Sequence, residues 1–267
     1  MLATLLLQVL AQAPVPSDWQ NQFLFPESFT AAAGAPLRLA LGRRNSGKIE
    51  PWEAMAWPKQ ELRYAFLQVD GQQVNRDRLS PATGSDSWVS LPLLRSGVAQ
   101  IGMDFQPKDV ALSAARWRSF WKLSLNGLEG WAWPHRKPIR LRWQRSHKCL
   151  VRATDADGRV GPAAAAQAKS GQWLQIRALA DPTVLPKGAD LPLRLYMGEV
   201  PGGQTRVVVH QPDGSRLLLR PRPGGLAHFR IGQAGLYAIE AHQLAPSSEP
   251  GLDGWWFTAT LTFEVQG

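Results

Sequence analysis

The fold of this chain is decided by a short stretch in its second half, Leu191–Met197, which reads LPLRLYM. Leucine or methionine occupies every second position, and Pro192, Arg194 and Tyr196 fall between them. Successive side chains of a β-strand point to opposite faces, so this period predicts a strand with one buried and one outward face.

Segments of the same kind occur along both halves of the chain. They are Leu37–Leu41, Leu62–Val69, Trp88–Leu94, Val98–Phe105, Arg206–His210, Arg216–Arg220, Leu226–Ile231, Leu236–His242 and Phe257–Val265. Turn-forming runs such as Pro212-Asp213-Gly214 and Pro223-Gly224-Gly225 separate them. The composition agrees, because 24 Gly and 21 Pro among 267 residues favour many turns, and 44% hydrophobic residues suffice for a packed core. Short strands with turn signals between them predict a β-sandwich.

The two halves also resemble each other in sequence. Gly34–Leu39 is similar to Gly188–Leu195, and Ser96–Ile101 is similar to Ala234–Ile239, in the same order along the chain. Such internal similarity indicates two copies of one structural unit. We therefore expect an all-β protein made of two immunoglobulin-like β-sandwich domains with one short helical insertion.

The expected domain limits follow from composition. The first sandwich should span about residues 20–160 and the second about residues 171–267, and the Ala-rich segment 161–170 should link them. Within the first sandwich, Asp109–Leu125 carries two tryptophans four residues apart. That spacing predicts a short amphipathic helix.

The first thirteen residues, Met1–Ala13, read MLATLLLQVLAQA. An apolar run followed by Ala-Gln-Ala is typical of a secretory signal peptide that is cleaved after Ala13. No segment reaches the ~18 consecutive apolar residues that a membrane-spanning helix needs. We therefore expect residues 1–13 to be a signal peptide and the protein to be soluble and exported, most simply to the periplasm.

The sequence carries little that is typical of an enzyme. It contains one cysteine, Cys149, which excludes an intrachain disulfide, a four-cysteine zinc site and an iron–sulfur cluster. Cys149 lies on the apolar side of an alternating strand, so we expect a buried, inert thiol. The sequence has no G-x-S-x-G, Walker, GxGxxG or HExxH motif. These observations favour a protein without enzymatic activity.

The positive charge is concentrated in one segment, Arg116–Arg152. This segment holds ten Lys or Arg and one acidic residue, and so equals the whole net charge of +9; it also holds five of the twelve tryptophans. Its end predicts a strand with Ile139 and Trp143 buried on one face. The opposite, solvent-facing row should consist of Arg140, Arg142, Lys148 and Arg152.

This row suits an anionic surface, such as lipid head groups, a polyanionic glycan or an acidic protein. Nucleic acid is not expected as a partner of an exported protein. The alternative is that arginine stems cover apolar surface with their charged groups in water, while the tryptophans fill the core.

Histidines supply the candidate metal ligands. Three of the five lie on strands of the second half: His210, His228 and His242. A sandwich could bring two of them together, and His combined with Asp or Glu suits nickel, cobalt, copper or zinc. Ordinary surface or hydrogen-bonded histidines are the alternative. His242 lies at a strand end, where a side chain can reach out of the sandwich interior.

Several short motifs recur in an order that is typical of one family of exported bacterial proteins. Near the start these are Phe23-Leu24-Phe25-Pro26 and Gly34-Ala35-Pro36, and in mid-chain Trp143, Arg145 and Lys148. In the second half these are Asp181-Pro182, Gly188, Leu193, Ala241-His242, Asp253 and Thr260–Val265. With these motifs the chain resembles the family catalogued as domain of unknown function 4198, whose members are often described as nickel-uptake components.

The resemblance implies two β-sandwiches, a periplasmic location and a role in transition-metal acquisition. His242 is the one histidine that matches a position of the family, so it is the foremost candidate metal ligand, with Asp253 next. His210 and His228 stay candidates from their strand positions alone. The chain departs from the family pattern at Asn21, where the family has a histidine, and at Trp255, where an acidic residue is common.

Two functions are therefore expected. The first is a non-enzymatic periplasmic binding or accessory protein for nickel or another divalent metal, with an envelope transporter or outer-membrane receptor as partner. The second is a structural or adhesion-type envelope module that docks a basic aromatic face on a membrane, a glycan or a protein.

Overall fold

The computed structural model describes residues 22–43, 53–54, 61–69, 72–76, 80–81, 87–92, 95–120, 137–202 and 204–267. These residues form three β-sheets, which we call sheets A, B and C. Sheet A has the order β1 (Gln22–Pro26), β3 (Pro36–Arg43), β8 (Trp88–Pro92) and β7 (Ser80–Pro81), and β4 (Glu53–Ala54) also pairs with β3. The strands of sheet C are β12 (Leu174–Ala178), β13 (Asp190–Met197), β14 (Val200–Pro201) and β17 (Leu226–Arg230).

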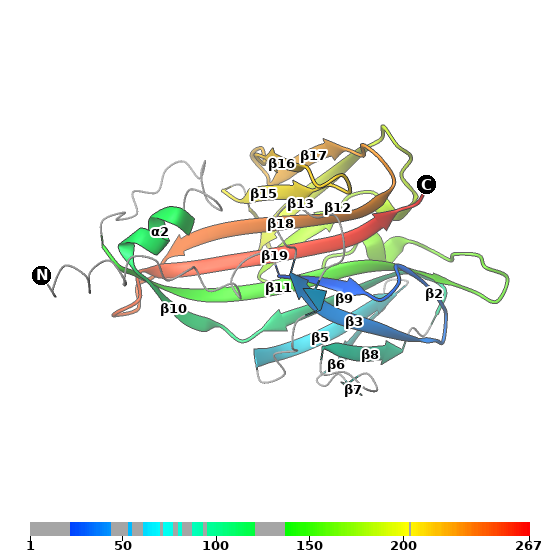
Figure 1. The fold of residues 1–267 in the computed structure, drawn as a ribbon, viewed down its shortest axis with the longest axis horizontal. Coiled ribbons are helices and arrows are strands. Elements are labelled where there is room, and N and C mark those ends of the chain that lie inside the picture. The colour runs from blue at the N-terminus through cyan, green and yellow to red at the C-terminus, as the bar shows by residue number, and fades with distance from the viewer. Residues whose placement is uncertain are drawn as a thin grey trace, which may run out of the picture.

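Sheet B runs through the whole molecule (Figure 1). Its order is β16 (Arg216–Leu219), β15 (Arg206–His210), β18 (Gly235–Pro246), β19 (Gly254–Val265), β11 (Ile139–Thr154), β9 (Gly97–Phe105), β5 (Leu62–Val69) and β6 (Gln72–Arg76). Two short strands, β2 (Thr30–Ala32) and β10 (Lys108–Leu112), also pair with β11.

The two halves of sheet B have the same order of strands, counted from the edge of the sheet to its centre. Each half has a hairpin, β5–β6 or β15–β16, then a long strand, β9 or β18, and then a last strand, β11 or β19. The two last strands pair in parallel and join the halves. The segments that echo each other in sequence occupy equivalent strands, β3 with β13 and β9 with β18.

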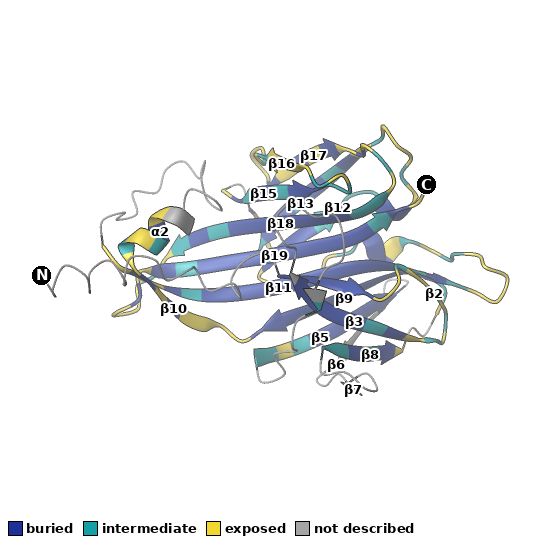
Figure 2. Ribbon diagram, viewed as in Figure 1, coloured by how far each residue is buried: buried dark blue, intermediate teal, exposed yellow. Residues whose placement is uncertain are grey.

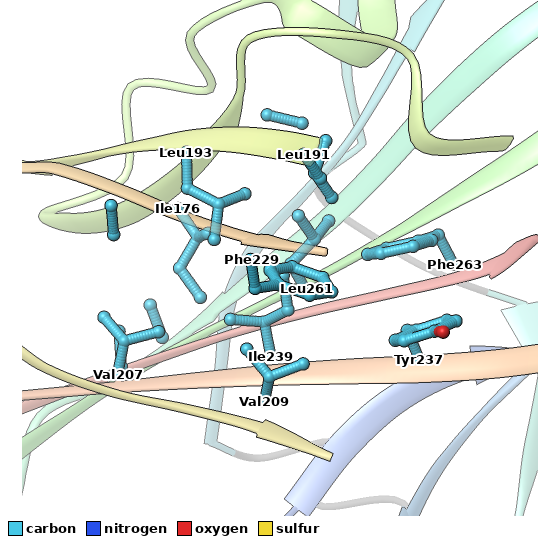
Figure 3. Packing of buried hydrophobic residues seen from close by; sticks show 14 of the residues in the cluster. Ile176, Leu191, Leu193, Val207, Val209, Phe229, Tyr237, Ile239, Leu261 and Phe263 are labelled. Carbon is cyan, nitrogen blue, oxygen red and sulfur yellow. The ribbon is translucent and has the colours of Figure 1, made fainter. Parts of the chain in front are cut away.

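Side chains alternate along the strands of sheet B, so the sheet has two faces that can each be buried. Sheet A packs against one face and sheet C against the other. In β18, Tyr237, Ile239 and Ala241 face sheet C and join one large apolar core (Figure 3). On the other face, Ile101 and Met103 of β9 join a second core with sheet A. Figure 2 shows how thoroughly both faces of the central strands are buried. The expected fold class, an all-β protein of two sandwiches with one short helix, is confirmed for the described residues.

The predicted strands of the second half agree closely with β13, β15, β16, β17, β18 and β19. The expected linker, residues 161–170, contains one short 3-10 helix, Ala164–Gln167, and a second 3-10 helix, Pro182–Val184, follows β12. Ala165 and Ala166 are buried, so the linker packs on the body of the protein.

The predicted helix over 109–125 was wrong in its first part. Residues Lys108–Leu112 form β10, which pairs with β11, and the helix α2 covers only Ala114–Phe120. Pairing with an existing strand edge satisfies the backbone of 108–112 directly, and residues 121–125 lie outside the described part of the chain. Trp117 of α2 is fully buried in a third apolar cluster with Trp143 and Trp256.

Candidate functional site

Two of the four predicted metal ligands come together in the structure. His210 on β15 and His242 on β18 both bind the carboxylate of Glu240, on the face of sheet B that looks away from sheet C. His210 Nε2 lies 3.1 Å from Oε2, and His242 Nε2 contacts Oε1. All three side chains are buried. We call them the His–Glu–His cluster.

The tautomer of His242 follows from its second nitrogen. Trp256 Nε1 donates to His242 Nδ1 at 3.3 Å, so Nδ1 carries no proton and Nε2 donates its own proton to Glu240. Burial alone would raise the pKa of Glu240, but the imidazoles of His242 and His210 outweigh burial and hold that pKa below its ordinary value. The cluster is therefore a carboxylate held by two N–H donors.

The hydrogen bonding of His242 does not fit a metal ligand. A metal-ligating imidazole offers one lone pair to the metal and donates its other N–H to an acceptor, whereas Trp256 donates into His242. Within the described ranges, no three His, Cys, Asp or Glu side chains are grouped so that they could hold a metal ion. Metal uptake stays a prediction of the sequence.

The other two predicted ligands lie elsewhere. His228 is exposed on β17, on the outer face of sheet C. Asp253 accepts a hydrogen bond from the backbone N–H of Arg140 at 2.7 Å. His242 is paired with Thr258 of β19. Asp253 comes five residues before Thr258, which places it about 16 Å away along the strand direction. The structure does not bring either residue to the His–Glu–His cluster.

The predicted basic row on β11 is wrong as a continuous solvent-facing row. Arg140 is exposed and Arg152 is partly exposed, but Lys148 is fully buried because strand β12 covers it. On the opposite face Ile139 and Trp143 are buried, as expected.

Arg142 is neutralised within the fold. Its guanidinium pairs with Asp109 at 2.6 Å and with Glu249 at 2.7 Å, and it lies over the ring of Trp255. The acidic groups that offset this arginine come from β10 and from the loop between β18 and β19. Arg142 is therefore an ion-pair partner within the fold, and no free member of an anion-binding row.

Lys148 has a structural role at the junction of the two halves. Its Nζ donates to the carbonyl oxygen of Ile176 at 2.7 Å and to Gln100 Oε1 at 3.2 Å. Complete burial lowers the pKa of this ammonium to about 7, against the opposing effect of Asp104. Cys149 next to it is buried too, and burial raises the pKa of its thiol, which fits an inert cysteine.

The sequence-based reasoning missed a cationic surface on the outer face of sheet C. Arg177 on β12 and Arg194 on β13 are directly paired across the two strands, so their side chains share one face. Three further cations belong to the same face, Lys169, Arg222 and Arg230, and among the described residues its carboxylates are Asp190 and Glu199. We call these five basic residues the sheet C cationic face.

Local structure fixes the two paired arginines. Arg194 Nε donates to the carbonyl oxygen of Gly224 at 3.2 Å, and its guanidinium lies 5.6 Å from the centre of the Tyr196 ring. Gly224 and Gly225 both have positive φ, and a Cβ at Gly225 would stand 2.5 Å from the Leu195 carbonyl oxygen. Glycines at 224 and 225 are therefore needed to place the Gly224 carbonyl oxygen against the Arg194 side chain.

Arg177 is held in the same way. Its Nε donates to the carbonyl oxygen of Gln167, in the linker. Neither Arg177 nor Arg194 forms an ion pair with a carboxylate in the described part of the chain. Alternation in Leu191–Met197 indicates that Arg194 points outward, but its pairing with Arg177 depends on register across a connection of more than ten residues, which the sequence pattern does not give.

Comparison with known proteins adds little. No protein-family model and no curated protein matches the sequence. Among solved structures the chain is similar to murine CEACAM1b, with 8% identity, coverage of 92% of this chain and 99% of that chain, and a TM-score of 0.22. It is similar to a Bacteroides ovatus glucan-utilisation protein, SGBP-B, in complex with a mixed-linkage heptasaccharide, with 10% identity, coverage of 93% and 47%, and a TM-score of 0.23.

A third similar structure is that of the fibronectin(III)-like modules of Clostridium thermocellum CbhA, with 8% identity, coverage of 91% and 94%, and a TM-score of 0.21. At these TM-scores the likeness carries no argument about function. No helix among the described residues is long and apolar enough to cross a membrane.

Proposed function

We propose that this protein is a non-enzymatic binding module that docks on an anionic partner through the sheet C cationic face. The observation that supports the proposal most directly is the pairing of Arg177 with Arg194 on neighbouring strands. Like charges at directly opposed positions of a sheet repel each other unless an anion lies close to both. The described residues supply no carboxylate partner to either one.

The surface as a whole has the right charge. Five cations, Lys169, Arg177, Arg194, Arg222 and Arg230, stand against two carboxylates, Asp190 and Glu199, and each of these carboxylates already pairs with one cation. A surface of this kind attracts polyanions over about a Debye length, which is ~8 Å at physiological salt. We therefore propose that the sheet C cationic face, and not the row on β11, binds the anionic surface. Export through Met1–Ala13 stays a prediction, since that segment lies outside the described residues.

The test is retention on anionic matrices in a salt gradient. The double variant Arg177→Glu/Arg194→Glu should elute at much lower salt than the native protein from heparin or from immobilised polygalacturonate. The matched control is Arg159→Glu combined with Arg116→Glu, which changes the net charge equally at exposed or partly exposed positions away from sheet C. Equal elution of the two double variants would contradict the proposal, because net charge alone would then explain retention.

A further inference from the structure

We propose that the anionic partner is an acidic polysaccharide, and that Arg177 and Arg194 grip one of its carboxylate or sulfate groups between them. This inference rests on the binding function proposed above and names the ligand class of the same surface.

We call Arg177 and Arg194 the clamp, and each of them is oriented by a backbone contact before the ligand arrives. Each Nε is tied to a backbone carbonyl, that of Gln167 for Arg177 and that of Gly224 for Arg194. The two terminal nitrogens of each guanidinium make no hydrogen bond to the described residues and remain available. A planar guanidinium binds an oxyanion through two parallel N–H groups. Because Nε is already hydrogen-bonded in both arginines, the oxyanion has to bind at the end of the guanidinium, where the two terminal nitrogens lie.

The Cβ spacing of the pair allows both side chains to reach one anion. Directly paired residues on neighbouring strands have Cβ atoms about 5 Å apart, and Arg177 and Arg194 are such a pair. An anion that contacts both guanidinium groups removes their mutual repulsion and gains two charge-assisted interactions. This gain distinguishes the pair from an isolated surface arginine, whose single exposed ion pair contributes little free energy.

The shape of the surface favours an extended polymer over a small molecule. Small ligands are held in concave pockets, whereas the clamp lies on the outer face of a sheet. Beyond the clamp, Arg222 and Arg230 lie on the same side of β13, toward β17, and Lys169 lies near Tyr196. A chain with repeated negative charges can reach several of these cations at once, and each contact adds to retention.

The same surface disfavours a lipid bilayer or a nucleic acid. Tyr196 beside the clamp is buried, with Lys169 Nζ at 4.6 Å and the Arg194 guanidinium at 5.6 Å. The exposed apolar side chains of sheet C come from three different segments: Trp173, Val200 and Leu226. Interfacial membrane binding uses a continuous apolar face, and single-stranded nucleic acid stacks successive bases on several open ring faces. A polysaccharide needs neither.

The experiment compares four probes on the native full-length chain by affinity electrophoresis or calorimetry. The probes are polygalacturonate, heparin, phosphatidylglycerol vesicles and neutral dextran. We expect binding to polygalacturonate or heparin, none to dextran, and weaker binding to vesicles than to either acidic polymer. In Arg177→Gln/Arg194→Gln the affinity for the acidic polymer should fall about ten-fold or more, since hydrogen bonds to charged groups are lost. Arg159→Gln should leave that affinity unchanged.

Each outcome separates the ligand class from the binding function. If vesicles are bound best and the double variant loses that binding, the docking function stands and the polysaccharide is wrong. If acidic polymers are bound but the double variant binds them equally well, both the clamp and the proposed docking face are wrong. If no probe is bound, both proposals are overturned. Unchanged circular dichroism and melting temperature of the variants establish that they are folded, which surface arginines should permit.

Discussion

The ammonium group of Lys148 on β11 donates to the carbonyl oxygen of Ile176 on β12, at 2.7 Å, and so links the strand at the centre of sheet B to sheet C. The side chain is 1% exposed. Because burial lowers its pKa to about 7, the protonation of Lys148 couples the stability of the fold to pH.

Lys148 loses its proton at a lower pH in the folded chain than in the unfolded chain. The unfolded chain keeps the proton up to an ordinary lysine pKa, whereas the folded chain gives it up near pH 7. Between these values the unfolded state binds more protons, so stability rises with pH. Relative to Lys148→Met, the native protein should gain about 1–2 kcal/mol in free energy of unfolding between pH 7 and about pH 8.5. Urea unfolding at the two pH values measures it, and parallel pH profiles would show that Lys148 does not titrate there.

The His–Glu–His cluster should contribute strongly to stability. Glu240→Gln removes the charge that two buried N–H donors share and turns an amide N–H toward one of them. We expect a loss of about 2–4 kcal/mol, because two buried N–H donors lose their charged acceptor. The control is Glu264→Gln on the neighbouring strand β19, which is not fully buried and should change stability by about 0.5 kcal/mol or less. Equal losses in urea unfolding would show that Glu240 is not the centre of the cluster.

Calorimetric titration with nickel, cobalt, copper and zinc examines the metal prediction. Because Trp256 donates to His242 Nδ1, the cluster as hydrogen-bonded has no lone pair of His242 directed at a metal. We expect no tight binding at neutral pH that depends on His242. Tight binding that His242→Ala abolishes would instead establish the expectation from sequence and require the ring of His242 to turn.

The two faces of β11 should differ sharply under mutation. Trp143 is buried and stacks on Trp256 with ring centres 4.7 Å apart, so Trp143→Ala should lower the free energy of unfolding by about 3–5 kcal/mol. Arg140 on the other face is exposed, and Arg140→Ala should change it by about 0.5 kcal/mol or less. Chemical denaturation of both variants checks this, and a large loss in Arg140→Ala would contradict the exposure of that side chain.

The sequence was sufficient for elements that depend on local pattern. Short apolar runs between turn residues predicted β5 and β15 with their bounds, at Leu62–Val69 and Arg206–His210. The internal echo predicted equivalent strands in the two halves. It could not show that β11 and β19 pair in parallel to make one continuous sheet, since this contact lies between residues more than a hundred positions apart.

The candidate site was predictable only in part, for the same reason. Alternation placed Lys148 on a polar face of β11, but whether that face meets solvent depends on where β12 lies. Histidine positions predicted that two of them could meet in a sandwich, as His210 and His242 do at Glu240. That Trp256 donates to His242 is a matter of side-chain geometry, which composition and spacing do not contain.

The central claim is that Arg177 and Arg194 hold one anion together, and a double-mutant cycle tests it most directly. The affinity for an oligogalacturonate of defined length is measured at fixed salt for the native protein, Arg177→Gln, Arg194→Gln and the double variant. Groups that share one ligand atom set are coupled, so each single variant should lose nearly as much affinity as the double variant, about ten-fold. Strictly additive losses, or single variants that bind like the native protein, would contradict a shared clamp.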